Sequence, residues 1–455
     1  MLSTAAGAEA RLAALGARLP ERRWLRFLLA ALLYGALVSP FVWSQLSKPD
    51  WVWLIDLGVY REAGRHVLAG DGEVYRFVTQ PLLLPFTYPP FPALLATWLA
   101  AVPKVVAGVL WTVAELATVV GITGYAFRPV LRRTRRGRPF LLAVLAAAMF
   151  WLLPVRDVAK FGQVDVFILA LVLADCAARR PRWPRGLLVG LATAIKLTPG
   201  LFVPYLWLSG RRRAAAVAAA TFVAAQGVAA AVMPGASREY WTSVIFASDR
   251  LGSNGGTSNE SIRGMLLRLH ADPTLTAVLW GVLAAVVLAV GARRALAAHR
   301  AGDEIAAVAV VGLVSVAVSP VSWIHHLVWV VLVVAVLGDD FTVPRRVVGA
   351  LGLTVFFVLR LPWWGAAIGI HGGPLDPARL VQDSFGIAVL VLVCVVPWRA
   401  RRRVPAAPPL VIQEYLPAIG GRPWSIMDGG CLVPAPPPAR LPARRRGRPW
   451  PGGRA

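Results

Sequence analysis

Apolar runs of roughly 17 to 25 residues recur along the whole sequence, separated by short polar stretches that hold most of the arginines. A run of this length crosses about 30 Å of hydrocarbon as an α-helix. Hydrophobic residues make up 57% of the 455 residues, which exceeds the share in soluble domains. The pattern predicts an all-α, polytopic membrane protein.

The basic residues fall in clusters between the apolar runs and in the last part of the chain. They give a net charge of +25, but no basic soluble domain is visible, so nucleic acid is not predicted as a partner. Lys and Arg concentrate in cytoplasmic loops, so the clusters mark the cytoplasmic side and the loops between them are external. The count that follows is about twelve transmembrane helices with both termini in the cytoplasm.

These markers divide the chain into three parts. Residues 1–24 are a cytoplasmic segment, residues 25–397 form the membrane domain, and residues 398–455 form a basic, Pro-rich tail that is predicted to be disordered. Within the membrane domain, residues 44–102 and 234–273 are the two long external loops. The bilayer is therefore a predicted partner, and the expected location is the cell membrane.

Two shorter stretches also have a predicted form. Residues 154–163 read as a polar external loop between the spans 140–153 and 164–178. Residues 186–208 have basic clusters at both ends, so a single crossing would violate the charge rule. We expect two short helices instead, broken at Lys196-Leu197-Thr198-Pro199-Gly200. Broken helices at membrane depth commonly line a site.

Polar residues that are unusual in such a chain fall at the external ends of the spans, which predicts a common external cavity. The first of them is Asp56, because an ionised side chain at the membrane boundary needs water, a partner or a function. It suits a general base for a hydroxyl, or an acid that is paired with Arg61 or Arg65 or that caps a helix. The other candidates are Tyr60, Tyr88, Arg156, Lys160, Gln163, Lys196, Asn259, Glu260, Ser322, His325 and His326.

Several of these candidates have two readings. Lys196 lies inside an apolar run, which favours a bound anion such as phosphate over a structural ion pair. Arg156 and Lys160 are either solvated or the second half of a phosphate clamp. Adjacent histidines have poor geometry for chelating a metal on a helix, so we expect one of His325 and His326 to face the cavity and the other to pack.

The stretch Asn259-Glu260-Ser261 is either a helix cap or a substrate contact. The sequence has no phosphate-binding loop of the Walker type, no dinucleotide fingerprint and no zinc signature. Its three cysteines are far apart. Neither a cofactor nor a metal is therefore predicted.

Six strings, in order along most of the chain, resemble glycosyltransferase family 87 of the C-type membrane glycosyltransferase superfamily. They are Asp56-Leu57-x-Val59-Tyr60, Phe86-Thr87-Tyr88-Pro89-Pro90-Phe91, Phe161-Gly162-Gln163-Val164, Ala194-Ile195-Lys196-Leu197-Thr198-Pro199, Asn259-x-Ser261-x-x-Gly264 and Ser319-Pro320-Val321-Ser322-Trp323-x-His325-His326. Asp165 and Glu260 depart from the pattern, since the family usually carries amides there.

The resemblance implies a C-type helical bundle whose large first external loop carries the catalytic acid. It implies inverting transfer of mannose from polyprenyl-phosphate-mannose to a mannosyl hydroxyl of a glycolipid or lipoglycan, which gives an α-1,2 linkage. Asp56 then matches the base, Lys196 the contact to the donor phosphate, and His325 or His326 the histidine pair of the family. The active site would face outward.

The residues leave three rival functions. A lipid or solute transporter would use a similar charged cavity, although no internal repeat is visible in the sequence. A C-type glycosyltransferase that uses another polyprenyl-phosphate sugar would carry similar strings. A non-catalytic assembly protein would be insensitive to Asp56→Asn.

Overall fold

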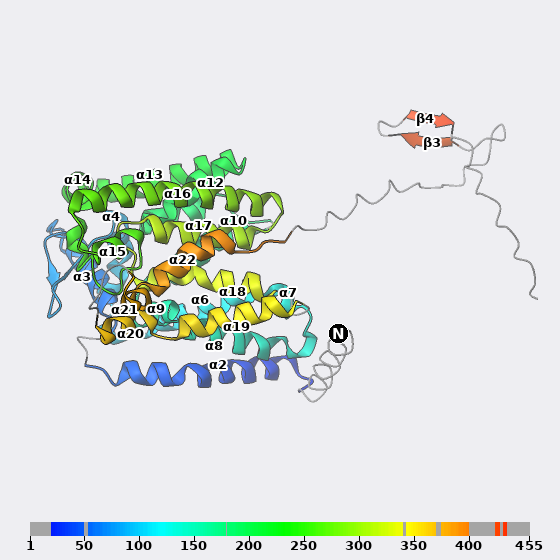
Figure 1. Ribbon diagram of the computed structural model, residues 1–455, viewed down its shortest axis with the longest axis horizontal. Coiled ribbons are helices and arrows are strands. Elements are labelled where there is room, and N and C mark those ends of the chain that lie inside the picture. Colours follow the sequence, from blue (N-terminus) through cyan, green and yellow to red (C-terminus); the bar gives the residue numbers. More distant parts are fainter. Residues whose placement is uncertain are drawn as a thin grey trace, which may run out of the picture. The chain divides into compact units, whose positions relative to one another are not determined.

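The computed structural model describes residues 20–49, 53–178, 180–339, 343–369, 375–399, 424–427 and 431–434. Up to residue 399 the described residues belong to one compact unit of helices, most of which run in similar or opposite directions (Figure 1). Residues 1–19 of the predicted cytoplasmic segment lie outside the described residues.

Four described helices are long and apolar enough to cross a membrane: α2 (Arg23–Leu46), α6 (Lys104–Ala126), α13 (Arg212–Val232) and α16 (Pro273–Arg300). Two bent pairs also qualify when each pair is counted as one span. They are α8 (Arg138–Trp151) with α9 (Leu153–Phe161), bent by 78°, and α19 (Pro344–Val358) with α20 (Leu361–Ile368), bent by 51°. The described residues thus contain four to six candidate spans, which does not confirm the predicted twelve.

Several short apolar helices fall outside this count. α17 (Glu304–Val318) and α18 (Val330–Gly338) are almost entirely buried, whereas only 11% of the apolar window of α16 is buried. Helices that are apolar all round belong to the interior of a bundle, and those with exposed Val and Leu suit contact with lipid. Further helices of the bundle are α7 (Arg128–Leu131), η1 (Arg135–Gly137), α10 (Asp165–Ala177) and α22 (Ser384–Val395).

The first long loop folds into α3 (Ile55–Ala69), a two-stranded hairpin of β1 (Val78–Thr79) and β2 (Leu84–Pro85), α4 (Pro90–Leu95) and α5 (Thr97–Ala101). The second contains α14 (Pro234–Thr242), η3 (Val244–Phe246), η4 (Ser248–Leu251) and α15 (Ile262–Leu267), and α21 (Pro377–Gln382) lies beside them. The two loops share a buried cluster in which the Tyr75 and Tyr240 rings stack at 5.5 Å. Both loops lie at the end of the bundle opposite to α7 (Figure 1).

The break at Lys196 is confirmed. α11 (Leu187–Ile195) ends there, the 3-10 helix η2 (Thr198–Leu201) follows, and α12 (Phe202–Leu208) continues the chain. Pro199 lies at the start of η2, where its missing N–H costs nothing.

The predicted loop at residues 154–163 is wrong in form. Most of it is α9, because Pro154 takes the first turn of a helix, where proline fits, and the following residues form a strongly amphipathic segment. The helix ends at Gly162, which has a φ of 75°.

Residues 401–455 form a separate unit. Its described residues are two antiparallel strands, β3 (Trp424–Met427) and β4 (Cys431–Pro434), paired from Trp424 with Pro434 to Met427 with Cys431. The remainder of the predicted disordered tail lies outside the described residues.

Candidate active site

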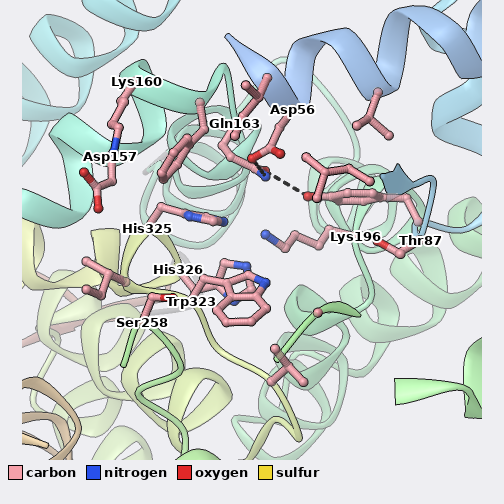
Figure 2. Close-up of a pocket in the computed structure, with 18 of the residues that line it drawn as sticks. Asp56, Thr87, Asp157, Lys160, Gln163, Lys196, Ser258, Trp323, His325 and His326 are labelled. Carbon is pink, nitrogen blue, oxygen red and sulfur yellow. Dashed lines mark hydrogen bonds between the residues drawn. The ribbon is translucent and has the colours of Figure 1, made fainter. Parts of the chain in front are cut away.

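A cavity of about 1600 Å³ opens at the loop end of the bundle. Its wall is formed by α2, α3, α9, the break at Lys196, the second loop and the 3-10 helix η5 (Ile324–Trp329). Figure 2 shows that Asp56, Gln163, Lys196 and His325 point toward one another from these separate segments. The predicted common cavity therefore exists, although nine of the twelve candidate residues line it and three do not.

Asp56 lies in the first turn of α3. A carboxylate is stabilised at this position by the positive end of the helix dipole. Its Oδ2 accepts a hydrogen bond of 2.6 Å from Nε2 of Gln163. The neighbouring Gly162 makes this approach possible, because a Cβ there would come within 2.8 Å of Cβ of Leu57.

Two tyrosines hold the Gln163 side chain in place. Its Oε1 lies 2.7 Å from the hydroxyl of Tyr60 and 2.8 Å from that of Tyr88, and the two hydroxyls are 2.9 Å apart. Burial raises the pKa of both tyrosines, so they remain protonated donors. Because the amide oxygen accepts from hydroxyls, the amide N–H₂ is directed at Asp56.

Burial raises the pKa of Asp56 to about 6, while the hydrogen bond from Gln163 and the charge of Lys196 act in the opposite direction. A general base is most effective when its pKa lies near the working pH, since it is then both ionised and able to take a proton. The environment of Asp56 meets this requirement.

Lys196 is already paired. Its Nζ lies 2.8 Å and 3.0 Å from the two carboxylate oxygens of Asp165, the first residue of α10. The ammonium also lies 5.7 Å from the centre of the Tyr88 ring. The sequence identified Lys196 as the cation, but it did not predict that Asp165 would neutralise it.

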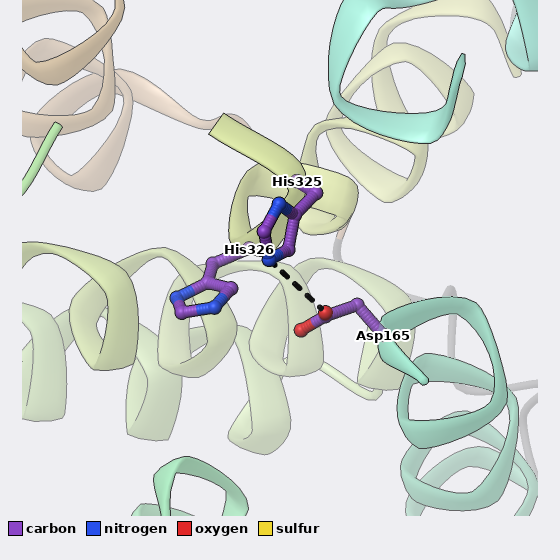
Figure 3. Close-up of side chains that lie close together, drawn as sticks. All are labelled: Asp165, His325 and His326. Atoms are coloured by element: carbon purple, nitrogen blue, oxygen red, sulfur yellow. Dashed lines mark ion pairs between the residues drawn. The ribbon is translucent and has the colours of Figure 1, made fainter. Parts of the chain in front are cut away.

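Both histidines lie beside Asp165 (Figure 3). His325 Nε2 is 4.0 Å from Asp165 Oδ2, and one ligand atom from each of Asp165, His325 and His326 lies within 4.8 Å of the others. The expectation that only one histidine would face the cavity is therefore wrong, because both rings line it. The geometric argument against a shared metal also fails, since Asp165 on another helix supplies the third position. The Lys196 ammonium, however, contacts the same carboxylate.

Arg156 and Lys160 line the cavity from α9, on either side of the buried Asp157. The guanidinium of Arg156 lies 5.9 Å from the Trp151 ring centre, and Nζ of Lys160 lies 4.5 Å from that of Phe161. Neither forms an ion pair within the described residues. Both are available to an anion in the cavity.

Asn259, Glu260 and Ser322 do not line this cavity. All three are fully buried behind its wall. Asn259 Oδ1 accepts from the backbone N–H of Ser322 at 2.9 Å, and Glu260 Oε2 accepts from that of Gly386 at 2.7 Å. They join the second loop to η5 and α22. The helix-cap reading of this stretch is confirmed at Ser261, whose Oγ accepts from the backbone N–H of Gly264 at 3.0 Å at the start of α15. Burial raises the pKa of Glu260 to about 8.

The sequence reasoning missed three cations that line the cavity, Lys48, Arg250 and Arg360. Arg250 lies in η4, and its guanidinium donates to the backbone carbonyl of Tyr75. Lys48 follows the end of α2, and Arg360 lies in the bend between α19 and α20. A signal was present, since external span ends carry few basic residues by the charge rule. Basic residues at predicted external ends are therefore candidates for function.

With the site in view, comparisons with known proteins decide the family. The model of glycosyltransferase family 87 matches residues 86–320, which is more than half of the chain. The chain belongs to glycosyltransferase family 87. As a member of that family it is a membrane glycosyltransferase, as the six sequence strings implied.

Curated relatives of this family 87 member carry specific names. A Mycobacterium tuberculosis protein named polyprenol-phosphate-mannose-dependent alpha-(1-2)-phosphatidylinositol mannoside mannosyltransferase is 36% identical over 76% of this chain and 84% of its own length. A Mycolicibacterium smegmatis protein of the same name is 38% identical over 70% of this chain and 77% of its own length. A second protein of that organism, named for phosphatidylinositol pentamannoside, is 35% identical over 76% and 84%. No solved structure matches the chain.

Proposed function

We propose that this glycosyltransferase moves mannose from polyprenol-phosphate-mannose to a mannosyl hydroxyl of a phosphatidylinositol mannoside, with inversion, forming an α-1,2 linkage. The names of the relatives support the donor, the acceptor class and the linkage. The observation that carries the reaction type is Asp56, a carboxylate on the cavity wall with a pKa of about 6 and a fixed hydrogen-bond donor.

The chemistry follows from the position of the two charged groups. Asp56 takes the proton of the acceptor hydroxyl while the oxygen of that hydroxyl forms the new bond to C1 of mannose. The bond between C1 and the phosphate oxygen breaks on the opposite face, and the electron pair leaves with the lipid phosphate. The Lys196 ammonium stabilises the charge that develops on that oxygen. General-base assistance of this kind contributes about a hundredfold to ten-thousandfold in rate.

The ion pair with Asp165 has a defined part in this scheme. It holds Lys196 as an ammonium in an apolar region, where an unpaired charge is costly. When a phosphate arrives, Nζ is shared between the two anions. His325 and His326, on the same wall, are placed to donate hydrogen bonds to the phosphate or the sugar.

The basic clusters support an outward-facing site in the cell membrane. α7, with Arg128, and the start of α19, with Arg345 and Arg346, lie at one end of the bundle, and α3 lies at the other (Figure 1). By the charge rule the basic end is cytoplasmic. The proposal retains about twelve crossings, because the short buried helices are counted with the long ones.

The test uses purified protein with decaprenyl-phosphate-mannose and a phosphatidylinositol mannoside. We expect a product that is one hexose heavier by mass spectrometry, and an α-1,2 bond by linkage analysis. Asp56→Asn removes the base and should abolish the product. Glu62→Gln is the matched control, because it makes the same chemical change on the same helix at a residue outside the cavity wall.

Full activity of Asp56→Asn would refute the base assignment. A product formed equally well with a glucosyl or arabinosyl polyprenyl phosphate would refute the donor.

A further inference from the structure

A second group of cations surrounds one buried carboxylate at the cavity wall. Lys48, Arg156, Lys160 and Arg360 line the cavity, and the charges of all four act on Asp157, whose side chain is largely buried. We call these four residues the α9 cation cluster. Together with Asp157 they carry a formal charge of +3.

This cluster is distinct from the cation beside the catalytic carboxylate, which is Lys196 (Figure 2). Lys196 is balanced by Asp165 at 2.8 Å. No carboxylate within the described residues forms an ion pair with a member of the cluster. In Figure 2, Asp157 and Lys160 lie on the other side of His325 from Lys196. The cavity therefore offers two separate positions for an anion.

The cluster lies where candidate spans end. Lys48 follows the last residue of α2 by two positions, Arg360 lies in the bend of the pair α19 and α20, and Arg156 follows the bend between α8 and α9. Trp151 and Trp363 line the same cavity, and the Trp151 ring centre lies 5.9 Å from the guanidinium of Arg156. Tryptophan is enriched at the level of the lipid headgroups, and arginine binds phosphate through its planar fork of N–H groups. The chemistry fits a phosphate that is carried by a membrane lipid.

Distance separates the two lipid phosphates of the reaction. The donor phosphate is bonded to the carbon under attack, so it must lie next to the catalytic centre, where Lys196 is. In a phosphatidylinositol mannoside, the inositol ring and at least one sugar ring separate the phosphate from the reacting hydroxyl. Arg156 precedes Phe161 by five residues, or about 7.5 Å of helix, and Gln163 at the catalytic carboxylate follows two residues later. Arg156 is thus displaced from the catalytic centre along α9, as the acceptor phosphate must be.

We propose that the α9 cation cluster binds the phosphodiester of the acceptor lipid and so selects phosphate-bearing acceptors. This inference rests on the proposed function. It assigns Lys48 and Arg360 to acceptor recognition, and it gives Arg156 and Lys160 a ligand other than the donor phosphate.

The test compares acceptors with and without the phosphodiester, using the full-length protein in nanodiscs. The double variant Lys48→Gln/Arg360→Gln should raise the KM for a phosphatidylinositol mannoside about tenfold, which corresponds to roughly 1.4 kcal/mol. The KM for an alkyl α-mannoside and the KM for the donor should stay unchanged, as should kcat. Raising the salt concentration should raise the KM for the phosphate-bearing acceptor in the parent protein more than in the variant.

Arg65→Gln is the matched control, because it removes one positive charge from the same loop end of the molecule at an exposed surface pair with Glu62. It should leave every KM unchanged. Arg156→Gln is a second variant. Because the Arg156 side chain is half-buried and that of Arg360 is exposed, its loss should raise the KM for the phosphate-bearing acceptor more than the loss of Arg360. Melting temperatures of all variants report whether the fold is retained.

A normal KM for the phosphate-bearing acceptor in folded Lys48→Gln/Arg360→Gln and Arg156→Gln would overturn the inference. A rise confined to the donor KM would also overturn it and would move the donor phosphate to the cluster. Either result leaves the proposed function standing, whereas failure of the parent protein to transfer mannose would overturn the function itself.

Discussion

Replacing Gln163 with leucine tests how the catalytic carboxylate is tuned. The side chain of Gln163 donates to Asp56 at 2.6 Å and partly offsets the effect of burial, which leaves the pKa of Asp56 at about 6. A hydrogen bond to a charged group is worth about 1.5 to 3 kcal/mol, and a change of one in pKa corresponds to roughly 1.4 kcal/mol. Gln163→Leu should therefore move the rising limb of the activity profile upward by at least about one pH unit.

The sign follows from the role of the base. Asp56 must be ionised to accept a proton, so kcat/KM rises with pH through the pKa of about 6. At pH 6 the ionised fraction should fall from about one half to about one tenth in Gln163→Leu, roughly a fivefold loss. At pH 8 the loss from ionisation is about one tenth or less. The activity defect should thus be large in mild acid and should shrink in mild base.

The assay is the initial rate of mannosyl transfer at low acceptor concentration, measured between pH 5 and pH 9. Tyr88→Phe is the control, since it keeps the bond between Gln163 and Asp56 and leaves Tyr60 to orient the amide. The rising limb of the activity profile of Tyr88→Phe should stay near pH 6. A loss of activity in Gln163→Leu that is equal at every pH would show that Gln163 positions a substrate and does not tune Asp56.

Three further predictions concern stability, and thermal unfolding in detergent measures each of them. The buried Glu260 has a folded pKa of about 8, above its ordinary value of 4.5, so stability falls as pH rises from about 4.5 to about 8 and levels off above that; the gain in stability of Glu260→Gln over the parent should be larger at pH 9 than at pH 6. Gly365→Ala should destabilise the protein by roughly 1–3 kcal/mol, because the new Cβ would lie 2.2 Å from a backbone nitrogen of α21, whereas Gly352→Ala, with open space around it, should be neutral or slightly stabilising. Asp165→Asn leaves the Lys196 ammonium buried without its carboxylate and should lower the free energy of unfolding by about 3–5 kcal/mol. Adding Lys196→Met should restore most of this loss. Equal melting temperatures for Asp165→Asn and the parent would show that the pair is not buried as described.

Local physical chemistry made part of this protein readable from its sequence. The hydrophobic run predicts a span from about Lys104 to Phe127, and α6 ends within one residue of these bounds, because crossing a bilayer demands a fixed number of apolar residues. The charge rule and Pro199 together located the helix break at Lys196. The position of Asp56, an acid just after the first apolar span, identified it as a candidate functional residue. Each signal depends only on residues that are close together in the chain.

Tertiary structure decided which polar groups meet. Gln163 contacts Asp56 across 107 positions of sequence, and Asp165 reaches Lys196 across 31, so no local pattern announces either pair. The same packing buried Asn259 behind the wall and brought both histidines to one carboxylate. Composition and periodicity indicate which polar residues need a hydrogen-bond or charge partner, because a charge in a region without water must be paired within the protein. How the helices pack decides which residue that partner is.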